Sequence, residues 1–246
     1  MSVSPYFNCP DFSDDYIELA AKTLLRDYMA WCDGDDLVPV RTEVIAEQFL
    51  EYTIEITNEG IFSDPECLGG IVFDGNCIKI NATVENHEGR YNFTIAHEIG
   101  HHVLHRDIYL EQRVGENNRI ICREAGDKPL VEQQADRFAA ALLMPKEEVS
   151  AAFALVDEGS LPTSTPTTKA LRALANKVVV IGGFSNVSNT AMVNRLVDLR
   201  LVSGAKYQTG TPQDFLRKSP SFRWVTNSQL SRTAYKLFCW VSEKFK

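Results

Sequence analysis

The segment HEIGHHVLH, residues 97–105, holds four of the five histidines of this 246-residue chain. His97 and His101 are four positions apart, which on a helix places two side chains on one face with their Cβ atoms about 5–6 Å apart. Two imidazoles in that arrangement can bind one Zn²⁺ through bonds of about 2.0–2.1 Å. The spacing therefore predicts a metal site with His97 and His101 as ligands.

Glu98 follows His97 directly and lies about 100° around the helix from it. It is therefore expected beside the metal and not on it, where its carboxylate can take a proton from a water and pass it to a leaving amine. Zinc lowers the pKa of such a water to about 7. These residues together predict a hydrolase with Glu98 as its catalytic residue.

The other two histidines of the segment are not expected to bind the same metal. His105 follows His101 by four positions, but two helical turns, about 12 Å, separate it from His97. The three rings cannot share one metal on a straight helix. His102 and His105 are therefore expected to support the site, to pack or to lie at the surface.

A carboxylate from another helix is the expected third ligand. Glu132 is the best placed, at the start of the strong helical pattern of residues 130–145. Asp136, one turn later, would share its face and could accept a hydrogen bond from the outer nitrogen of a ligand histidine, which fixes the tautomer of that ring. Pattern alone leaves Glu116 and Glu124 as alternatives.

Hydrophobic periodicity predicts the elements that carry these residues. Residues 53–58 alternate like a half-buried strand, and residues 69–81 read as a hairpin around Asp74-Gly75, a dipeptide favoured in type I′ turns. The motif follows on a helix over residues 90–105. Further helices are predicted over residues 14–32, 41–52, 130–145, 146–154, 168–177, 188–199 and 227–244. Strands followed by helices indicate an α+β fold.

Composition narrows the class of protein. The hydrophobic content of 44% can fill a core. The sequence has neither a long apolar run nor a leader-like start, and its six cysteines include no C-x-x-C pair. We therefore expect a soluble cytoplasmic protein with reduced thiols and no membrane contact.

The formal charge of −8 is uneven along the chain: residues 1–90 carry −13, residues 91–145 carry −2 and residues 146–246 carry +7. A basic C-terminal part could meet nucleic acid. It contains no dense run of Lys and Arg, however, so nucleic acid is a possible partner but not the favoured one.

Two segments resemble the ImmA/IrrE family of zinc metallopeptidases: RYNFTIAHEIGH, residues 90–101, and EQQADRFAAALLMP, residues 132–145. The PV at 39–40 and the IKIN at 78–81 fit the same scheme. The resemblance covers roughly residues 15–203. It implies a thermolysin-like minimal zinc peptidase, in which a small twisted sheet packs on the motif helix and on a glutamate-bearing helix, with helices following.

The resemblance also implies the site residues and the biology. The ligands would be His97, His101 and Glu132, with Glu98 catalytic. Members of the family act in bacterial or phage-derived systems and commonly cut a nearby-encoded helix-turn-helix repressor of the XRE type, which releases stress or mobile-element genes. A zinc endopeptidase with such a repressor as substrate is therefore expected.

The expected organisation has three parts. Residues 1–155 form the metallopeptidase core, residues 156–203 a linker and a closing helix pair, and residues 204–246 an extension of unknown role. Arg200 stands where the family usually has a glycine, which leaves the local geometry there open.

The closing helix pair also suggests an alternative function. Ser188 could open a recognition helix carrying Asn189, Asn194 and Arg195, as in helix-turn-helix proteins. An integral helix pair of the peptidase domain explains the apolar positions better. The alternative is a DNA-binding or repressor-binding regulator that uses the peptidase fold without proteolysis.

Two further hypotheses concern the substrate. An extended peptide could add to a sheet edge formed by residues 76–81. Tyr91 is a candidate for stabilising the oxyanion.

Overall fold

The structure is a computed structural model, and it describes residues 9–34, 36–58, 61, 67–111, 121–122, 129–157 and 168–202. Most of the predicted linker, the helix predicted over residues 227–244 and the predicted extension lie outside the described residues. In the part that the structure describes, no helix is both long enough and apolar enough to cross a membrane.

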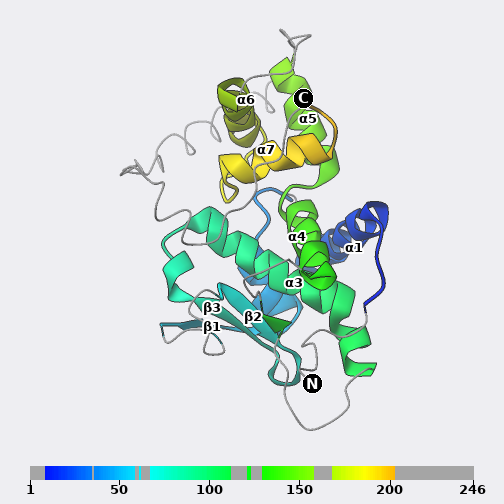
Figure 1. Cartoon of the computed structure of the whole chain (residues 1–246). Helices are drawn as coiled ribbons and strands as arrows, with labels where there is room; N and C mark the ends of the chain where they lie inside the picture. Colours follow the sequence, from blue (N-terminus) through cyan, green and yellow to red (C-terminus); the bar gives the residue numbers. More distant parts are fainter. Residues whose placement is uncertain are drawn as a thin grey trace. The chain divides into compact units, whose positions relative to one another are not determined.

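A four-stranded sheet is formed within the described residues, in the order β1-β3-β2-β4 (Figure 1). Its strands are β1 (Thr53–Thr57), β2 (Gly69–Val72), β3 (Cys77–Asn81) and β4 (Ile121–Cys122). β3 pairs in parallel with β1 and antiparallel with β2, and β2 pairs antiparallel with β4. The sheet and its helices confirm the predicted α+β class.

The predicted hairpin of residues 69–81 is confirmed as β2 and β3, but its turn is longer than expected. A 3₁₀ segment, Phe73–Gly75, precedes Asn76, whose φ of 44° is left-handed. β3 lies between β1 and β2, so both of its edges are already hydrogen-bonded. The hypothesis that a substrate strand adds along residues 76–81 is therefore wrong.

Helix α3 (Glu88–Glu111) lies across one face of the sheet and carries the histidine motif (Figure 1). Ile71 and Ile78 are cross-strand partners, so their side chains share one face of the sheet. Both are fully buried, as are Ile95 and Ile99 of α3. Each such side chain contributes about 1.5–3 kcal/mol by burial. This packing fastens α3 to the sheet and fixes the direction of its other faces.

Helix α4 (Leu130–Leu143) packs closely against α3. A Cβ on Gly100 would lie 3.2 Å from the carbonyl oxygen of Ala135 and 3.2 Å from Cδ1 of Phe138. Small residues on both helices therefore permit this approach. Because Glu132 lies one turn before Ala135, the approach brings its carboxylate to the histidines of α3.

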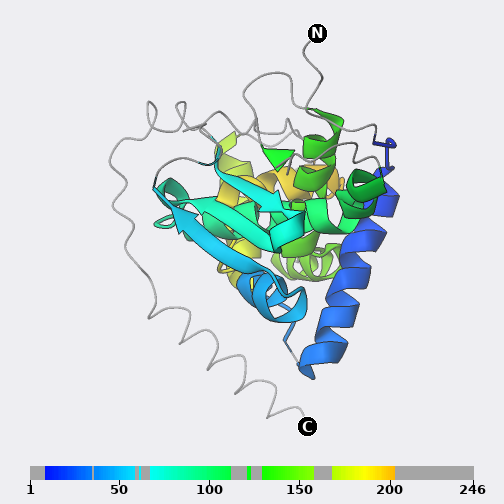
Figure 2. The same cartoon turned by 90° about the horizontal axis from the view of Figure 1, so that it is seen from below.

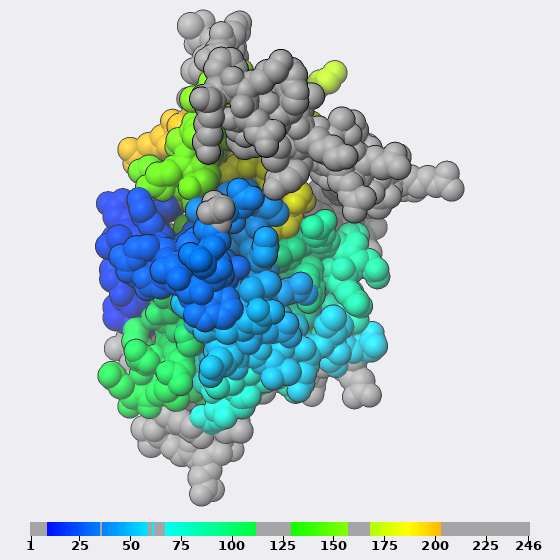
Figure 3. Space-filling view, turned by 180° about the vertical axis from the view of Figure 1, so that it is seen from behind, coloured from blue at the N-terminus to red at the C-terminus, as the bar shows by residue number. Residues whose placement is uncertain are grey.

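Helix α1 (Asp14–Cys32), which is the blue helix in Figure 2, packs against α4. Its start is confirmed, because Ser13 Oγ accepts a hydrogen bond from the Tyr16 amide at 3.2 Å. The segment predicted as a helix over residues 41–52 is α2 (Thr42–Val44) followed by a π-helical turn. These N-terminal elements form the blue surface seen from behind in Figure 3.

Three helices follow α4: α5 (Lys146–Asp157), α6 (Thr168–Ile181) and α7 (Asn189–Asp198). α6 is longer than predicted, since residues 178–181 continue it. α7 begins as expected, with Ser188 Oγ accepting from the Ala191 amide at 3.1 Å. α6 and α7 pack against each other.

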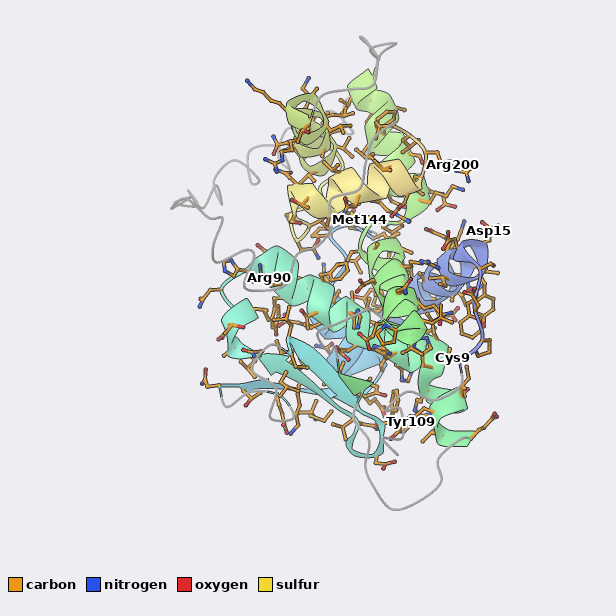
Figure 4. All side chains as sticks on the ribbon, viewed as in Figure 1. Cys9, Asp15, Arg90, Tyr109, Met144 and Arg200 are labelled. Carbon is orange, nitrogen blue, oxygen red and sulfur yellow. The ribbon has the colours of Figure 1, made fainter. Side chains whose placement is uncertain are left out.

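Arg195 ties α7 to two other helices. Its Nε donates to the carbonyl oxygen of Met144 at 2.8 Å. Met144, labelled in Figure 4, lies at the end of α4. Nη1 and Nη2 of Arg195 donate to the carboxylate of Glu18 on α1, the latter at 2.9 Å. The side chain is buried. The suggestion that Arg195 reads DNA is therefore wrong, because its guanidinium is an internal link.

Arg200 occupies a left-handed position just beyond α7, with a φ of 57° (Figure 4). The amides of Arg200 and Leu201 bond the carbonyls of Val197 and Leu196 at 3.0 and 2.9 Å, the pattern of a Schellman motif. This motif ordinarily uses glycine, because a Cβ in the left-handed region costs about 1–2 kcal/mol. The geometry left open by the sequence is thus the usual one, held by a strained arginine.

Arg200→Gly is expected to raise the free energy of unfolding by about 0.5–1 kcal/mol, since relief of strain is partly offset by a more flexible unfolded chain. Urea unfolding measures the change. Arg200→Ala keeps the Cβ and is the matched control. An equal gain in both variants would contradict the strain at this position.

Candidate metal centre

The structure brings together the three residues predicted as ligands. His97 Nε2 lies 3.1 Å from His101 Nε2 and 3.1 Å from Glu132 Oε2, and His101 Nε2 lies 3.2 Å from Glu132 Oε1. The residues are 4%, 1% and 1% exposed. Two turns of α3 and the first turn of α4 supply them. Glu132 thus joins the histidines from 31 residues beyond His101.

The donor atoms of this cluster suit a metal ion. A tetrahedral metal with bonds of about 2.0–2.1 Å spaces its ligand atoms about 3.3 Å apart, close to the distances found here. Glu132 Oε1 is buried and accepts no hydrogen bond from the described residues. A buried carboxylate oxygen in that position requires a positive partner. Two imidazoles and one carboxylate therefore fit a divalent cation.

Asp136 contacts the ring nitrogen of His97 that faces away from the ligand cluster. Its Oδ1 lies 2.9 Å from His97 Nδ1. A carboxylate only accepts hydrogen bonds, so Nδ1 of His97 carries the proton and Nε2 presents a lone pair to the cluster. This is the position predicted for Asp136, one turn after Glu132 on the same face of α4.

His105 lies behind the second histidine. Its Nδ1 is 3.0 Å from His101 Nδ1, and its Nε2 is 3.0 Å from Gln134 Oε1. His102 points elsewhere, since its Nδ1 is 2.9 Å from the hydroxyl of Tyr52. The expectation that neither residue joins the three-residue cluster agrees with these contacts.

Burial and neighbouring charges shift the pKa values of two groups here. Burial would raise the pKa of Glu132, but the adjacent imidazoles of His101 and His97 hold it well below its usual range. Burial, with a contribution from the neighbouring His101, lowers the pKa of His105 to about 3. Glu132 is therefore a carboxylate and His105 a neutral imidazole near pH 7.

Glu98 lies on α3 beneath the start of β2 and is 3% exposed. A Cβ added to Gly69 would lie 2.9 Å from Glu98 Oε1 and 2.4 Å from Thr94 Cγ2. The strand therefore approaches the helix so closely that only glycine leaves room for the Glu98 carboxylate. Gly69 was not among the sequence-predicted site residues, although the Gly-Gly pair at the start of a strand is a signal of close backbone approach.

Gly69→Ala is expected to lower kcat/KM about tenfold, because the added methyl displaces Glu98 or the helix beneath it. Overpacking of this kind also lowers the free energy of unfolding by about 1–3 kcal/mol. Gly75→Ala is the control, since its Cβ would meet nothing closer than Val72 Cγ1 at 3.8 Å. Full activity in the folded Gly69→Ala variant would show that this contact does not position Glu98.

Of the three other candidates from the sequence, the structure describes one. Glu116 and Glu124 lie outside the described residues. The Tyr91 hydroxyl donates to Glu43 Oε1 at 2.7 Å, which engages it outside the cluster. Gln134, like Gly69, was missed, because nothing in a helical pattern distinguishes its amide from that of a surface glutamine.

Comparison with known proteins agrees with the site. Residues 61–158 match the family model described as IrrE N-terminal-like domain, Peptidase_M78. The matched segment contains both helices of the cluster, and it confirms the resemblance stated from the sequence over this part of the chain. No curated protein and no solved structure matches the chain. The matched domain and the cluster together indicate a metallopeptidase.

Proposed function

We propose that the protein is a zinc-dependent endopeptidase, because residues 61–158 match the model of the IrrE N-terminal-like domain. The observation that carries the proposal is the buried cluster of His97, His101 and Glu132, whose donor atoms lie 3.1–3.2 Å apart. Two imidazoles and one carboxylate form a donor set that catalytic zinc sites use, with a fourth position left for water or substrate.

The chain's residues have distinct roles in this proposal. His97, His101 and Glu132 hold the ion, and Asp136 orients the ring of His97. Zinc, when bound, supplies a Lewis acid that polarises the scissile carbonyl and makes a nearby water more acidic. Glu98 takes the proton of the attacking water and returns it to the leaving nitrogen, so it acts as base and then as acid.

The proposed substrate is a helix-turn-helix repressor in a bacterial or phage-derived regulatory system. The support is the resemblance to the ImmA/IrrE family, whose members commonly cut such repressors. The proposal includes a role in stress response or mobile-element transcription and a cytoplasmic location. A repressor encoded beside this chain is the first substrate to test.

The test is metal removal and restoration. The purified chain is incubated with the repressor, and mass spectrometry identifies the cut. Cleavage is expected to stop when a chelator removes the metal and to return on addition of zinc. Cleavage that persists in the metal-free chain would contradict the proposal that the protein is a zinc-dependent peptidase. Zinc binding without cleavage of any nearby repressor would reject the substrate and leave the metal site standing.

The rival function is a regulator that binds a repressor or DNA without cutting. It predicts a stable complex with an intact partner and no dependence on Glu98. Gel filtration and electrophoresis of the same mixtures distinguish it, because a peptidase leaves two fragments.

A further inference from the structure

We propose that His105 and Gln134 position the metal ligand His101 through a chain of directed hydrogen bonds that begins at the backbone carbonyl of Pro10. The chain fixes the tautomer in which His101 Nε2 carries no proton and can bind the ion. This inference rests on the proposed zinc site and extends it to residues in the core and in the N-terminal segment.

The direction of the chain is set at Pro10. A carbonyl oxygen can only accept, and Gln134 Nε2 lies 2.8 Å from it, so the amide nitrogen of Gln134 faces Pro10. The side-chain oxygen of Gln134 must then point the other way. Gln134 is fully buried, so solvent cannot supply an alternative partner. The orientation of this amide is therefore decided by the backbone of residues 9–12.

The directions of the two following bonds can be assigned in turn. Gln134 Oε1 only accepts, so His105 Nε2, at 3.0 Å, donates to it. The Nδ1 atoms of His105 and His101 lie 3.0 Å apart, so one of them donates and the other accepts. His101 Nε2 faces the ligand cluster and must be free of a proton to bind the ion, so the proton of His101 is on Nδ1, and Nδ1 of His105 accepts it.

The two ligand histidines are thus held in different ways. His97 donates to a carboxylate, Asp136, whereas His101 donates to a neutral ring. The hydrogen bond from His101 to His105 adds no negative charge beside the ligand, but it connects the orientation of His101 to the N-terminal residues 9–12. Phe12 of this segment stacks on His105, with ring centroids 6.5 Å apart. A displacement of this N-terminal segment would therefore reach a metal ligand through two side chains.

The first test measures zinc affinity of the full chain by competition with a chelator. His105→Leu is expected to bind zinc about 10–100-fold more weakly, as found when outer partners of ligand histidines are removed. His105→Asn should recover most of the loss, because its Oδ1 can replace Nδ1 as the acceptor. His102→Leu is the matched control and should bind as the wild type does, since its partner is Tyr52.

The second test asks whether Gln134 acts on His101 through His105, as the series of hydrogen bonds requires. Gln134→Leu is expected to weaken zinc binding less than His105→Leu, and the double variant should bind as His105→Leu does, because Gln134 acts through His105. Losses that add in the double variant would overturn this order. So would a His105→Leu chain with wild-type zinc affinity.

A third readout needs no variant and holds even if these substitutions impair folding. Two-bond ¹H–¹⁵N correlation spectra of the zinc-loaded wild type should place the ring proton of His101 on Nδ1 and that of His105 on Nε2. A proton on Nδ1 of His105 overturns the inference. A wild-type chain that binds no zinc overturns the proposed function instead, so the two failures are distinguishable.

Discussion

Glu98→Gln is expected to reduce the rate of peptide hydrolysis by about 10³-fold while zinc content stays at the wild-type level. Glutamine has the shape of glutamate and fits the space beside Gly69, but it cannot take a proton from water. General acid–base groups contribute about 10²–10⁴-fold, and Glu98 is assigned both proton transfers. Cleavage rate and metal content of the same preparation measure the two effects.

Glu111→Gln is the matched control, because Glu111 lies exposed at the far end of the same helix. It should leave rate and zinc content unchanged. Substrate processing that survives at the wild-type rate in Glu98→Gln would remove Glu98 from catalysis. Lost zinc in that variant would mean that Glu98 acts on the metal site itself.

Glu132→Ala is expected to weaken zinc binding by at least about a hundredfold. Zinc sites with four protein ligands bind with about 10–16 kcal/mol, so one ligand accounts for about 3 kcal/mol, or some two orders of magnitude. The variant also removes the carboxylate that offsets the positive charge of the ion between the two buried histidines. Chelator competition measures the affinity, and cleavage should fall with it at limiting zinc.

Glu147→Ala provides the control for Glu132. It also removes a carboxylate near α4, but from an exposed ion pair with Lys22 that solvent screens and that contributes little to stability. Zinc affinity should not change in this variant. If Glu132→Ala kept full zinc affinity, Glu132 would not be the third ligand, and Glu116 and Glu124 would be the next residues to replace.

The two variants separate the proposed roles. If Glu98→Gln loses activity but keeps its zinc, the general base and the metal ligands are different residues. Glu132→Ala should lose both, with activity partly restored by excess zinc. Restoration by zinc in Glu98→Gln is not expected, because the missing group there transfers protons.

The part of the site that lies on one helix could be read from spacing. His97, Glu98 and His101 fall within five positions of α3, and the geometry of an α-helix is set by its own backbone hydrogen bonds. The same holds for the Ser13 and Ser188 helix starts and for the β2–β3 hairpin. In each case the interacting groups are a few residues apart, so no distant packing is needed to place them.

The register and the order of the strands in the sheet could not be predicted from local spacing. β3 pairs with β1 on one side and with β2 on the other, although β2 separates β1 from β3 in the sequence. This order places β3 in the interior of the sheet and removes it as a docking edge. Arg195 could not be placed either, since a polar residue on an amphipathic helix is usually exposed, whereas here Glu18 and Met144 compensate its burial.

The sequence was sufficient for the pair of histidines, for the neighbouring glutamate and for Glu132 as the best-placed third ligand, because helical spacing and a paired signature carry that information. Folding settled the distances between elements. The close packing of α3 and α4 at Gly100 brings Glu132 and Asp136 to the histidines, the approach of β2 at Gly69 seats Glu98, and Gln134 joins His105 to Pro10. These contacts link residues 29 to 124 positions apart, and only side-chain packing in the folded core determines such distances.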